Sequence, residues 1–148
     1  MAVGDVDSHA KNYSILLSPG RAELALLYDL MSGLDWPNIT PNHAQDIGGQ
    51  QRGSHIYGRH WRRMAQEAGL AGPATARRVV RGAERVLTEL PGAVEEVAAM
   101  PAGGAGLARF AAAIAERAAL VRDHAAIGGP PEPDAEPVAV FAAHYDGE

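Results

Sequence analysis

Three oxygen-bearing side chains in the first part of the chain have the types and spacing for metal-assisted phosphoryl transfer. Asp7 and Asn12 belong to the segment Asp7-Ser8-His9-Ala10-Lys11-Asn12, and Asp29 follows a run of β-prone residues. In kinase-type chemistry an Asp positions the attacking hydroxyl, an Asn about five residues later binds a metal ion, and a second Asp binds the metal that bridges the phosphates. Such oxygens are ligands of Mg²⁺. By spacing alone, however, a segment like this is more often a solvated turn than an active site.

A β-hairpin is expected to bring these side chains together. Residues 13–17 and 24–28 are short apolar runs, and Ser18-Pro19-Gly20-Arg21 between them has the composition of a tight turn. A hairpin here would return the chain to its first segment. We therefore expect Asp29 to lie near Asp7 and Asn12.

The remainder of the chain is predicted to be a loop followed by helices. Residues 36–53 contain prolines, amides and paired glycines without a sustained period, which is typical of an ordered loop. Helical periodicity predicts four helices, with Gly69 ending the first and Pro91 the second. Their ranges are 57–68, 73–90, 93–100 (short) and 107–124.

The predicted fold class is mainly α. The catalytic loop, hairpin and metal motif of residues 1–30 are expected to pack against a bundle of three or four helices over residues 54–125. Trp61, Met64 and Leu70 are assigned to the core, because apolar residues at helical spacing are more often core than ligand contacts. Residues 1–127 then form one domain.

The composition excludes several classes of protein. The chain has 148 residues, 47% of them hydrophobic, with no cysteine and a formal net charge of −5. Disulfide scaffolds, thiolate zinc sites and thiol catalysis are excluded. No signal peptide or membrane-length apolar stretch is evident, so we expect a cytoplasmic protein that contacts no membrane. Residues 128–148 are acidic and Pro-rich, which predicts a flexible tail.

The histidines are scattered and lack the paired spacing of a zinc site. We expect His9 to order the Asp7 segment by hydrogen bonding. The others are expected to be surface or loop residues, namely His43, His55, His60, His124 and His144.

Two groups of arginines are candidates for contact with nucleic acid or a partner. Arg77, Arg81 and Arg85 share one face of a predicted helix, where they could contact phosphate oxygens. The alternative is a solvated face in which Arg81 pairs with Glu84 or with a side chain near Glu89. The second group comprises Arg52, Arg59, Arg62 and Arg63.

These segments together resemble the C-terminal part of HipA-type serine/threonine kinases, the toxins of type II toxin–antitoxin pairs. The pattern of that family is a Gly-Asn-x-Asp-x-His-x-Lys-Asn loop, a hairpin, a Tyr-Asp pair, an Ile-Gly-Gly segment and a Trp-bearing helix before Ala-Gly-Leu. The chain has Gly4-Asp5-Val6-Asp7-Ser8-His9-Ala10-Lys11-Asn12, Tyr28-Asp29, Ile47-Gly48-Gly49 and Trp61 before Gly69-Leu70. The resemblance covers about residues 3–125.

The resemblance implies site residues, cofactors and partners. Asp7 would be the catalytic base, Lys11 would lie beside the transferred phosphoryl group, and Asn12 and Asp29 would bind Mg²⁺. ATP and Mg²⁺ would be the cofactors. A HipB-like antitoxin repressor would be the partner, with operator DNA reached only through it. Asp5 departs from the pattern because the family usually has Asn there. This extra carboxylate either repels Asp7 or faces solvent.

By this resemblance we expect these 148 residues to be one half of a kinase. They have no Gly-rich loop over the phosphates, no strand Lys and no helical Glu partner, and Pro101–Gly106 is followed by neither Lys-Ser nor Lys-Thr. We therefore expect a catalytic lobe that transfers the γ-phosphoryl group of ATP to a serine or threonine hydroxyl only when a nucleotide-binding lobe complements it. The alternatives are a non-catalytic module that binds an antitoxin-like repressor and a truncated relic.

Overall fold

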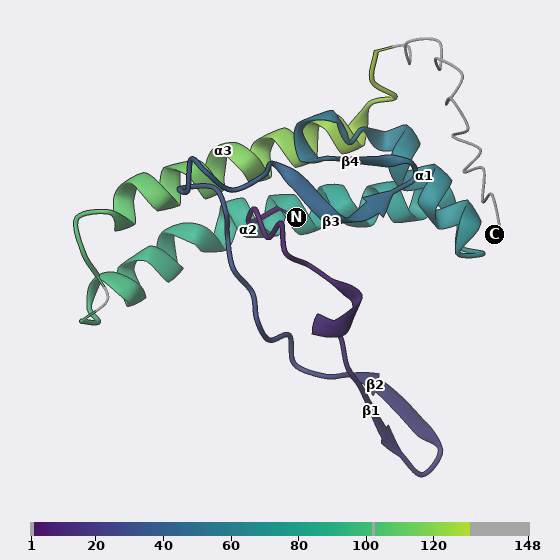
Figure 1. Ribbon diagram of the computed structural model, residues 1–148, viewed down its shortest axis with the longest axis horizontal. Coiled ribbons are helices and arrows are strands. Elements are labelled where there is room, and N and C mark those ends of the chain that lie inside the picture. Colours follow the sequence, from purple (N-terminus) through teal and green to yellow (C-terminus); the bar gives the residue numbers. More distant parts are fainter. Residues whose placement is uncertain (1, 102, 131–148) are drawn as a thin grey trace, which may run out of the picture.

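The computed structural model describes residues 2–101 and 103–130 and confirms the mainly α fold (Figure 1). Most of the predicted acidic tail lies outside the described residues. The three α-helices are α1 (Gly58–Glu67), α2 (Gly72–Ala98) and α3 (Leu107–Ala126). The shorter elements are the 3₁₀ turns η1 (Ala10–Asn12) and η2 (Gly53–His55) and the strands β1 (Ile15–Ser18), β2 (Arg21–Leu24), β3 (Asn42–Ile47) and β4 (Gln50–Arg52).

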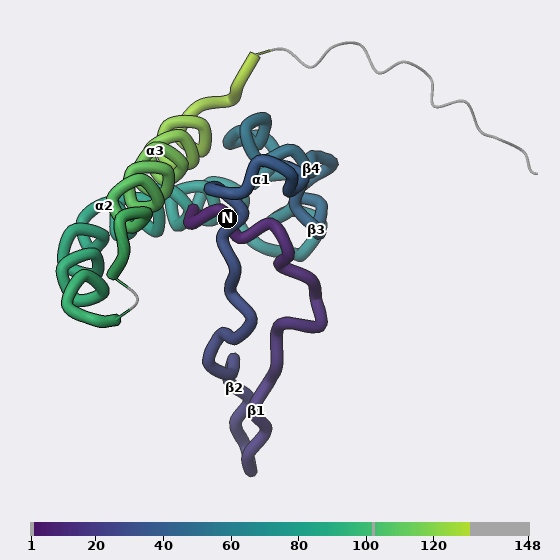
Figure 2. The backbone as a smooth tube through the Cα atoms, turned by 60° about the vertical axis from the view of Figure 1, so that its left-hand side comes forward, coloured from purple at the N-terminus to yellow at the C-terminus, as the bar shows by residue number. Residues whose placement is uncertain are grey.

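The helices form the core of the molecule. The long helices α2 and α3 lie side by side in both views of the backbone, and α1 packs against the N-terminal part of α2 (Figures 1 and 2). Ala83 of α2 and Ala118 of α3 are 1% and 0% exposed, so small side chains permit a close approach of the two helices. The main apolar cluster contains Ile56, Trp61, Ala76 and Ala125, with Met64 packed against it.

Two predictions about the helices were wrong. Helix α2 continues through Pro91, so Pro91 is not a stop and no separate helix covers 93–100. Pro91 is exposed and removes only one backbone hydrogen bond, while the rest of α2 keeps its packing against α3. Leu70 is 55% exposed and does not belong to the core. It follows the helix end that Gly69 was correctly predicted to mark.

The first hairpin is confirmed, but its position differs from the prediction. Strands β1 and β2 are antiparallel, with Ser18 opposite Arg21 across the Pro19-Gly20 turn. Every residue of both strands is exposed. Figures 1 and 2 both show the hairpin projecting away from the helices, so it does not pack against the bundle as expected.

Residues 36–53 are not simply a loop, because they contain a second hairpin. Strand β3 pairs antiparallel with β4 through Asn42 opposite Arg52 and Ile47 opposite Gln50. Gly48 and Gly49 form its turn with φ values of +55° and +85°, and the Gly49 amide donates to Asp46 Oδ1 at 2.7 Å. This hairpin packs on α1. No described helix is both long enough and apolar enough to cross a bilayer.

Candidate functional site

The segment that carries Asp7 is held between two other parts of the chain. The amide of Gly33 donates to the carbonyl of Gly4 at 3.0 Å, and Asp5 forms an antiparallel bridge with Ser32. On the opposite side, the amide of Ala44 in β3 donates to the carbonyl of Val6 at 2.9 Å. These bonds fix the backbone immediately before Asp7.

Asp7, His9 and Asn12 come together within this segment. The Nε2 atom of His9 lies 3.0 Å from Oδ1 of Asp7, and both side chains are 49% exposed. Asn12 is buried, and its Nδ2 donates to the backbone carbonyl of Asp7 at 3.0 Å. The amide of Asn12 also donates to the carbonyl of His9 at 2.9 Å, which closes η1. The Asp7 carboxylate is therefore accessible on a rigid loop.

The chain returns to this loop after the first hairpin through Tyr28. Its hydroxyl donates to the carbonyl of Lys11 at 2.8 Å and lies 3.2 Å from Ser14 Oγ. Asp29 follows in the left-handed region with φ of 55° and is exposed. In the described part of the chain, its carboxylate makes no hydrogen bond or ion pair. The structure thus joins the Tyr28-Asp29 pair to η1 without a direct bond from Asp29 to Asn12.

A divalent metal has few protein ligands here. Within residues 2–101 and 103–130, no three His, Asp or Glu side chains cluster closely enough to hold a metal ion. The Asn12 side chain nevertheless suits a cation, because its amide nitrogen is already used and its oxygen remains as an acceptor. Asn12 and Asp29 would leave most of an octahedral shell to phosphates and water.

A buried polar group lies behind the loop, and sequence reasoning missed it. His43 of β3 is 5% exposed, so the prediction of a surface histidine was wrong. Its Nδ1 lies 3.1 Å from the carbonyl of Asp5, and its Nε2 lies 3.2 Å from a guanidinium nitrogen of Arg117 in α3. Burial lowers the pKa of His43 to about 4, and Arg117 acts in the same direction. Burial also lowers the pKa of Arg117.

Asp5 does not face solvent, which answers one alternative left open by the sequence. The residue is 4% exposed, and its Oδ1 has no hydrogen-bond partner. The backbone carbonyl of Asp5 is bonded to His43, but the carboxylate is not. The departure from Asn at this position therefore places a carboxylate in the interior.

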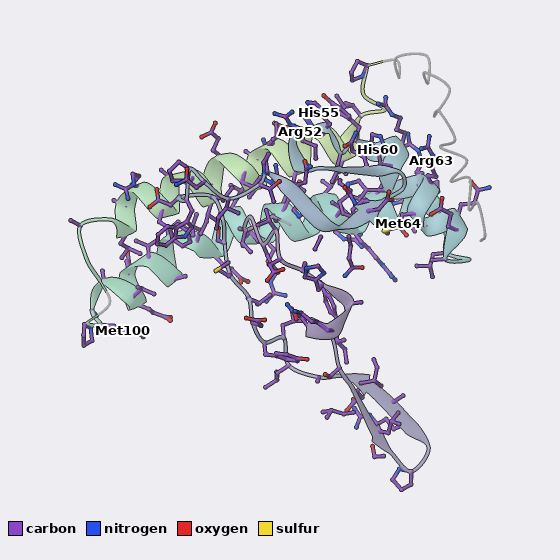
Figure 3. All side chains as sticks on the ribbon, viewed as in Figure 1. Arg52, His55, His60, Arg63, Met64 and Met100 are labelled. Carbon is purple, nitrogen blue, oxygen red and sulfur yellow. The ribbon has the colours of Figure 1, made fainter. Side chains whose placement is uncertain are left out.

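Other predicted surface histidines also have structural contacts. His60 is 3% exposed, and its Nδ1 accepts a hydrogen bond from the Tyr57 amide at 2.9 Å at the start of α1. The ring of His124 stacks on Tyr57 with centroids 4.2 Å apart. In Figure 3, His60, Arg63 and Met64 project from α1, and Arg63 donates to the carbonyl of Gly48 at 3.0 Å.

The three arginines predicted to share one face of α2 have different surroundings. Arg85 pairs with Glu89 at 2.8 Å, so the ion pair expected for Arg81 is made by its neighbour. Arg77 and Arg81 instead border a hollow of about 450 Å³ together with Arg62 of α1. This hollow lies on a different part of the molecule from the Asp7 loop.

Comparison with known proteins identifies the family. The model of the HipA-like C-terminal domain matches residues 1–94. The chain belongs to this HipA-like family. A Sinorhizobium fredii (strain NBRC 101917 / NGR234) protein named "Putative kinase Y4mE" is 31% identical over 122 residues, which are 82% of this chain and 29% of that protein.

The fold of the HipA-like chain is also found in a solved structure. It superposes with a TM-score of 0.68 on a chain of the Shewanella oneidensis MR-1 complex of HipA, HipB and operator DNA. The two are 21% identical, and the match covers 82% of this chain and 30% of that one. The 148 residues therefore span less than a third of either protein.

Proposed function

We propose that this chain is the catalytic lobe of a HipA-like protein serine/threonine kinase and transfers the γ-phosphoryl group of ATP once a nucleotide-binding lobe completes it. The observation that carries the proposal is the gathering of Asp7, His9 and Asn12 on one loop fixed from both sides. Membership of the HipA-like family supports it. The similarity to a protein named as a kinase points to the same chemistry.

Each loop residue has a distinct proposed role. Asp7 is the base that orients and deprotonates the acceptor hydroxyl, because its accessible carboxylate sits on a rigid backbone. His9 holds that carboxylate in place, and Lys11 lies beside the transferred phosphoryl group. Asn12 and Asp29 are the proposed ligands of Mg²⁺, which would neutralise charge on the phosphates when bound.

The exposed first hairpin is the proposed surface for the second lobe. Large apolar side chains of residues 13–36 are about half exposed or more, which is unusual for a surface that stays in water. They include Tyr13, Ile15, Leu16, Leu17, Leu24, Leu26, Leu27, Tyr28, Leu30, Met31 and Trp36. A lobe seated here would cover this apolar surface and bring bound ATP to the Asp7 loop.

Point variants in a fused protein test the roles. The remainder of the Sinorhizobium fredii relative, joined upstream of this chain, supplies the second lobe. Asp7→Ala should lower transfer from labelled ATP by ~10²–10⁴-fold, the range for a lost general base. Asp29→Asn should raise the Mg²⁺ concentration needed for half-maximal rate. Asp123→Asn, on the exposed surface of α3, is the matched control and should leave the rate unchanged. An active Asp7→Ala protein would contradict the assignment.

A second candidate function is repressor binding without catalysis. The hollow bordered by Arg62, Arg77 and Arg81 favours it, because guanidinium groups there are suited to carboxylates of a partner. The structural neighbour was solved with HipB and operator DNA. If this function is correct, Arg77→Ala with Arg81→Ala should weaken capture of a HipB-like repressor while Arg85→Ala, whose guanidinium is paired with Glu89, should not.

A further inference from the structure

A cavity of about 380 Å³ lies behind the catalytic loop, between the loop and β3. It is within the size range of small-molecule sites. Its polar lining comes from Asp5, Ser8 and Gln45, and its apolar lining from Trp61, Ile47 and Ala10. Tyr13 and His43 complete the wall, and no Lys or Arg contributes to it.

The Ser8 and Tyr13 hydroxyls of the wall are hydrogen-bonded to each other, and the side chains of Asp5 and Gln45 offer acceptors. Asp5 is only 4% exposed, and its Oδ1 atom has no hydrogen-bond partner. Gln45 uses its Nε2 to donate to the carbonyl of Ser8 at 2.6 Å, which leaves its amide oxygen as an acceptor. His43 has both ring nitrogens engaged, with Asp5 and Arg117, so it presents its ring to the cavity.

A buried carboxylate oxygen without a partner is costly, and a bound donor would remove that cost. The Ser8 and Tyr13 hydroxyls of the wall are bonded to each other and not to Asp5, and no cationic side chain lines the cavity, so a ligand can supply the donor that Asp5 lacks. A metal ion is a poor candidate, since within the described ranges no cluster of three His, Asp or Glu side chains occurs. The rings of Trp61 and Tyr13 favour an organic cation, whose charge is attracted to aromatic faces.

We propose that this cavity is a binding site for a small organic cation, an amidinium, guanidinium or protonated amine that donates N–H groups to Asp5 and packs its carbon part against Trp61. Gln45 supplies a second acceptor. Neither Asn12 nor Asp29 lines the cavity, so the binding of an organic cation does not require Mg²⁺ or ATP. It can therefore be tested on the chain alone.

The test uses a charged probe and its neutral isostere. Benzamidinium and benzamide share a ring and a planar head group but differ in charge. With the ¹⁵N-labelled full chain at pH 7, benzamidinium should shift the indole N–H resonance of Trp61 saturably, and benzamide should bind at least about tenfold more weakly, the loss expected for a charge-assisted hydrogen bond. Trp36→Phe assigns the two indole resonances. Equal binding of both probes, or no saturable shift with either, would overturn the proposal.

Three variants distinguish an effect of the Asp5 carboxylate on binding from a general effect on the structure. Asp5→Asn keeps the shape of the side chain and should weaken benzamidinium at least about tenfold. Asp123→Asn removes an exposed carboxylate on α3 and should change nothing. Ala10→Phe fills the cavity while keeping Asp5, so it should abolish the shift, and it decides the matter if Asp5→Asn fails to fold. Unchanged affinity in Asp5→Asn or in Ala10→Phe would contradict the site.

Discussion

The guanidinium of Arg117 lies 3.2 Å from Nε2 of His43, and this contact joins α3 to β3, the strand behind the Asp7 loop. Because a guanidinium only donates, Nε2 accepts and the proton of neutral His43 is on Nδ1. That Nδ1–H donates to the carbonyl of Asp5 at 3.1 Å. Two residues 74 positions apart therefore fix the backbone that precedes Asp7.

The neutral state of His43 predicts a pH dependence of stability. Its pKa is about 4 in the folded chain because of burial, against 6.5 as the ordinary value. Between these values the unfolded chain binds a proton that the folded chain does not, so this stability is present above pH 6.5 and is lost as the pH falls toward 4. Allowing for partial screening, we expect a loss of about 2 kcal/mol.

Urea unfolding at pH 7.5 and pH 5.0 measures this effect. The loss of stability on acidification should be smaller in His43→Gln than in the unmodified chain. His124, whose pKa burial also lowers, adds the same background to both proteins. Identical losses in the two proteins would show that His43 is not held neutral.

Gly53 and Gly82 should respond oppositely to alanine. A Cβ at Gly53 would lie 1.9 Å from a guanidinium nitrogen of Arg117, so Arg117 would have to leave His43. We expect Gly53→Ala to cost about 1–3 kcal/mol of unfolding free energy. Gly82 is inside α2 with nothing within 4 Å of its Cβ position, and Gly82→Ala should stabilise by about 0.5–1 kcal/mol. Thermal unfolding of the two variants tests the pair, and stabilisation by Gly53→Ala would refute the packing described for Arg117.

Alanine substitutions at Gly48 and Gly20 distinguish the cost of backbone strain from the cost of a steric clash. Both glycines have positive φ, +55° and +73°, but only a Cβ at Gly48 would meet the His60 carbonyl, at 2.2 Å. Gly20→Ala should cost about 1–2 kcal/mol for the left-handed conformation alone. Gly48→Ala should cost at least about 2 kcal/mol more, because the turn must move away from α1. Urea midpoints that match in the two variants would mean that the Gly48 turn does not rest on α1.

The elements predicted correctly are those with strong local signals. The Pro19-Gly20 turn, the periodic pattern around Trp61 and the alanine-rich 107–124 stretch each indicate their structure without distant contacts. Strand β3 was missed because Asn-His-Ala-Gln-Asp-Ile has only one β-branched residue, Ile47, and no Phe, Tyr or Trp. It is held by the bond from Ala44 to Val6, which is a tertiary contact. Pro91 is likewise tolerated because of packing between α2 and α3.

Some features of the candidate site could likewise be predicted from the sequence, and others could not. The approach of His9 and Asn12 to Asp7 follows from a short loop and could be anticipated from spacing. The burial of Asp5 and the partnership of His43 with Arg117 could not, because they depend on how α3 packs on a strand distant in sequence. The sequence also cannot indicate that the first hairpin leaves its apolar residues uncovered.

Hydrogen exchange should reveal the uneven stability of the chain. Amides of β1 and β2, whose residues are all exposed, should exchange much faster than those in the packed interior of α2 and α3. Exchange followed by mass spectrometry gives the comparison directly. Equal protection of the hairpin would indicate that it is already covered, for example by a second copy of the chain.

The most direct test of the kinase assignment is transfer from labelled ATP to a protein acceptor as a function of added nucleotide-binding lobe. The remainder of the Sinorhizobium fredii relative is supplied as a separate chain at rising concentration. Because the proposed function assigns the groups that cradle the β- and γ-phosphates to the second lobe, this chain alone should show no transfer, and the rate should rise to saturation as the second lobe binds. Transfer by the chain alone at the saturated rate, or none when binding of the two lobes has been verified, would contradict the account.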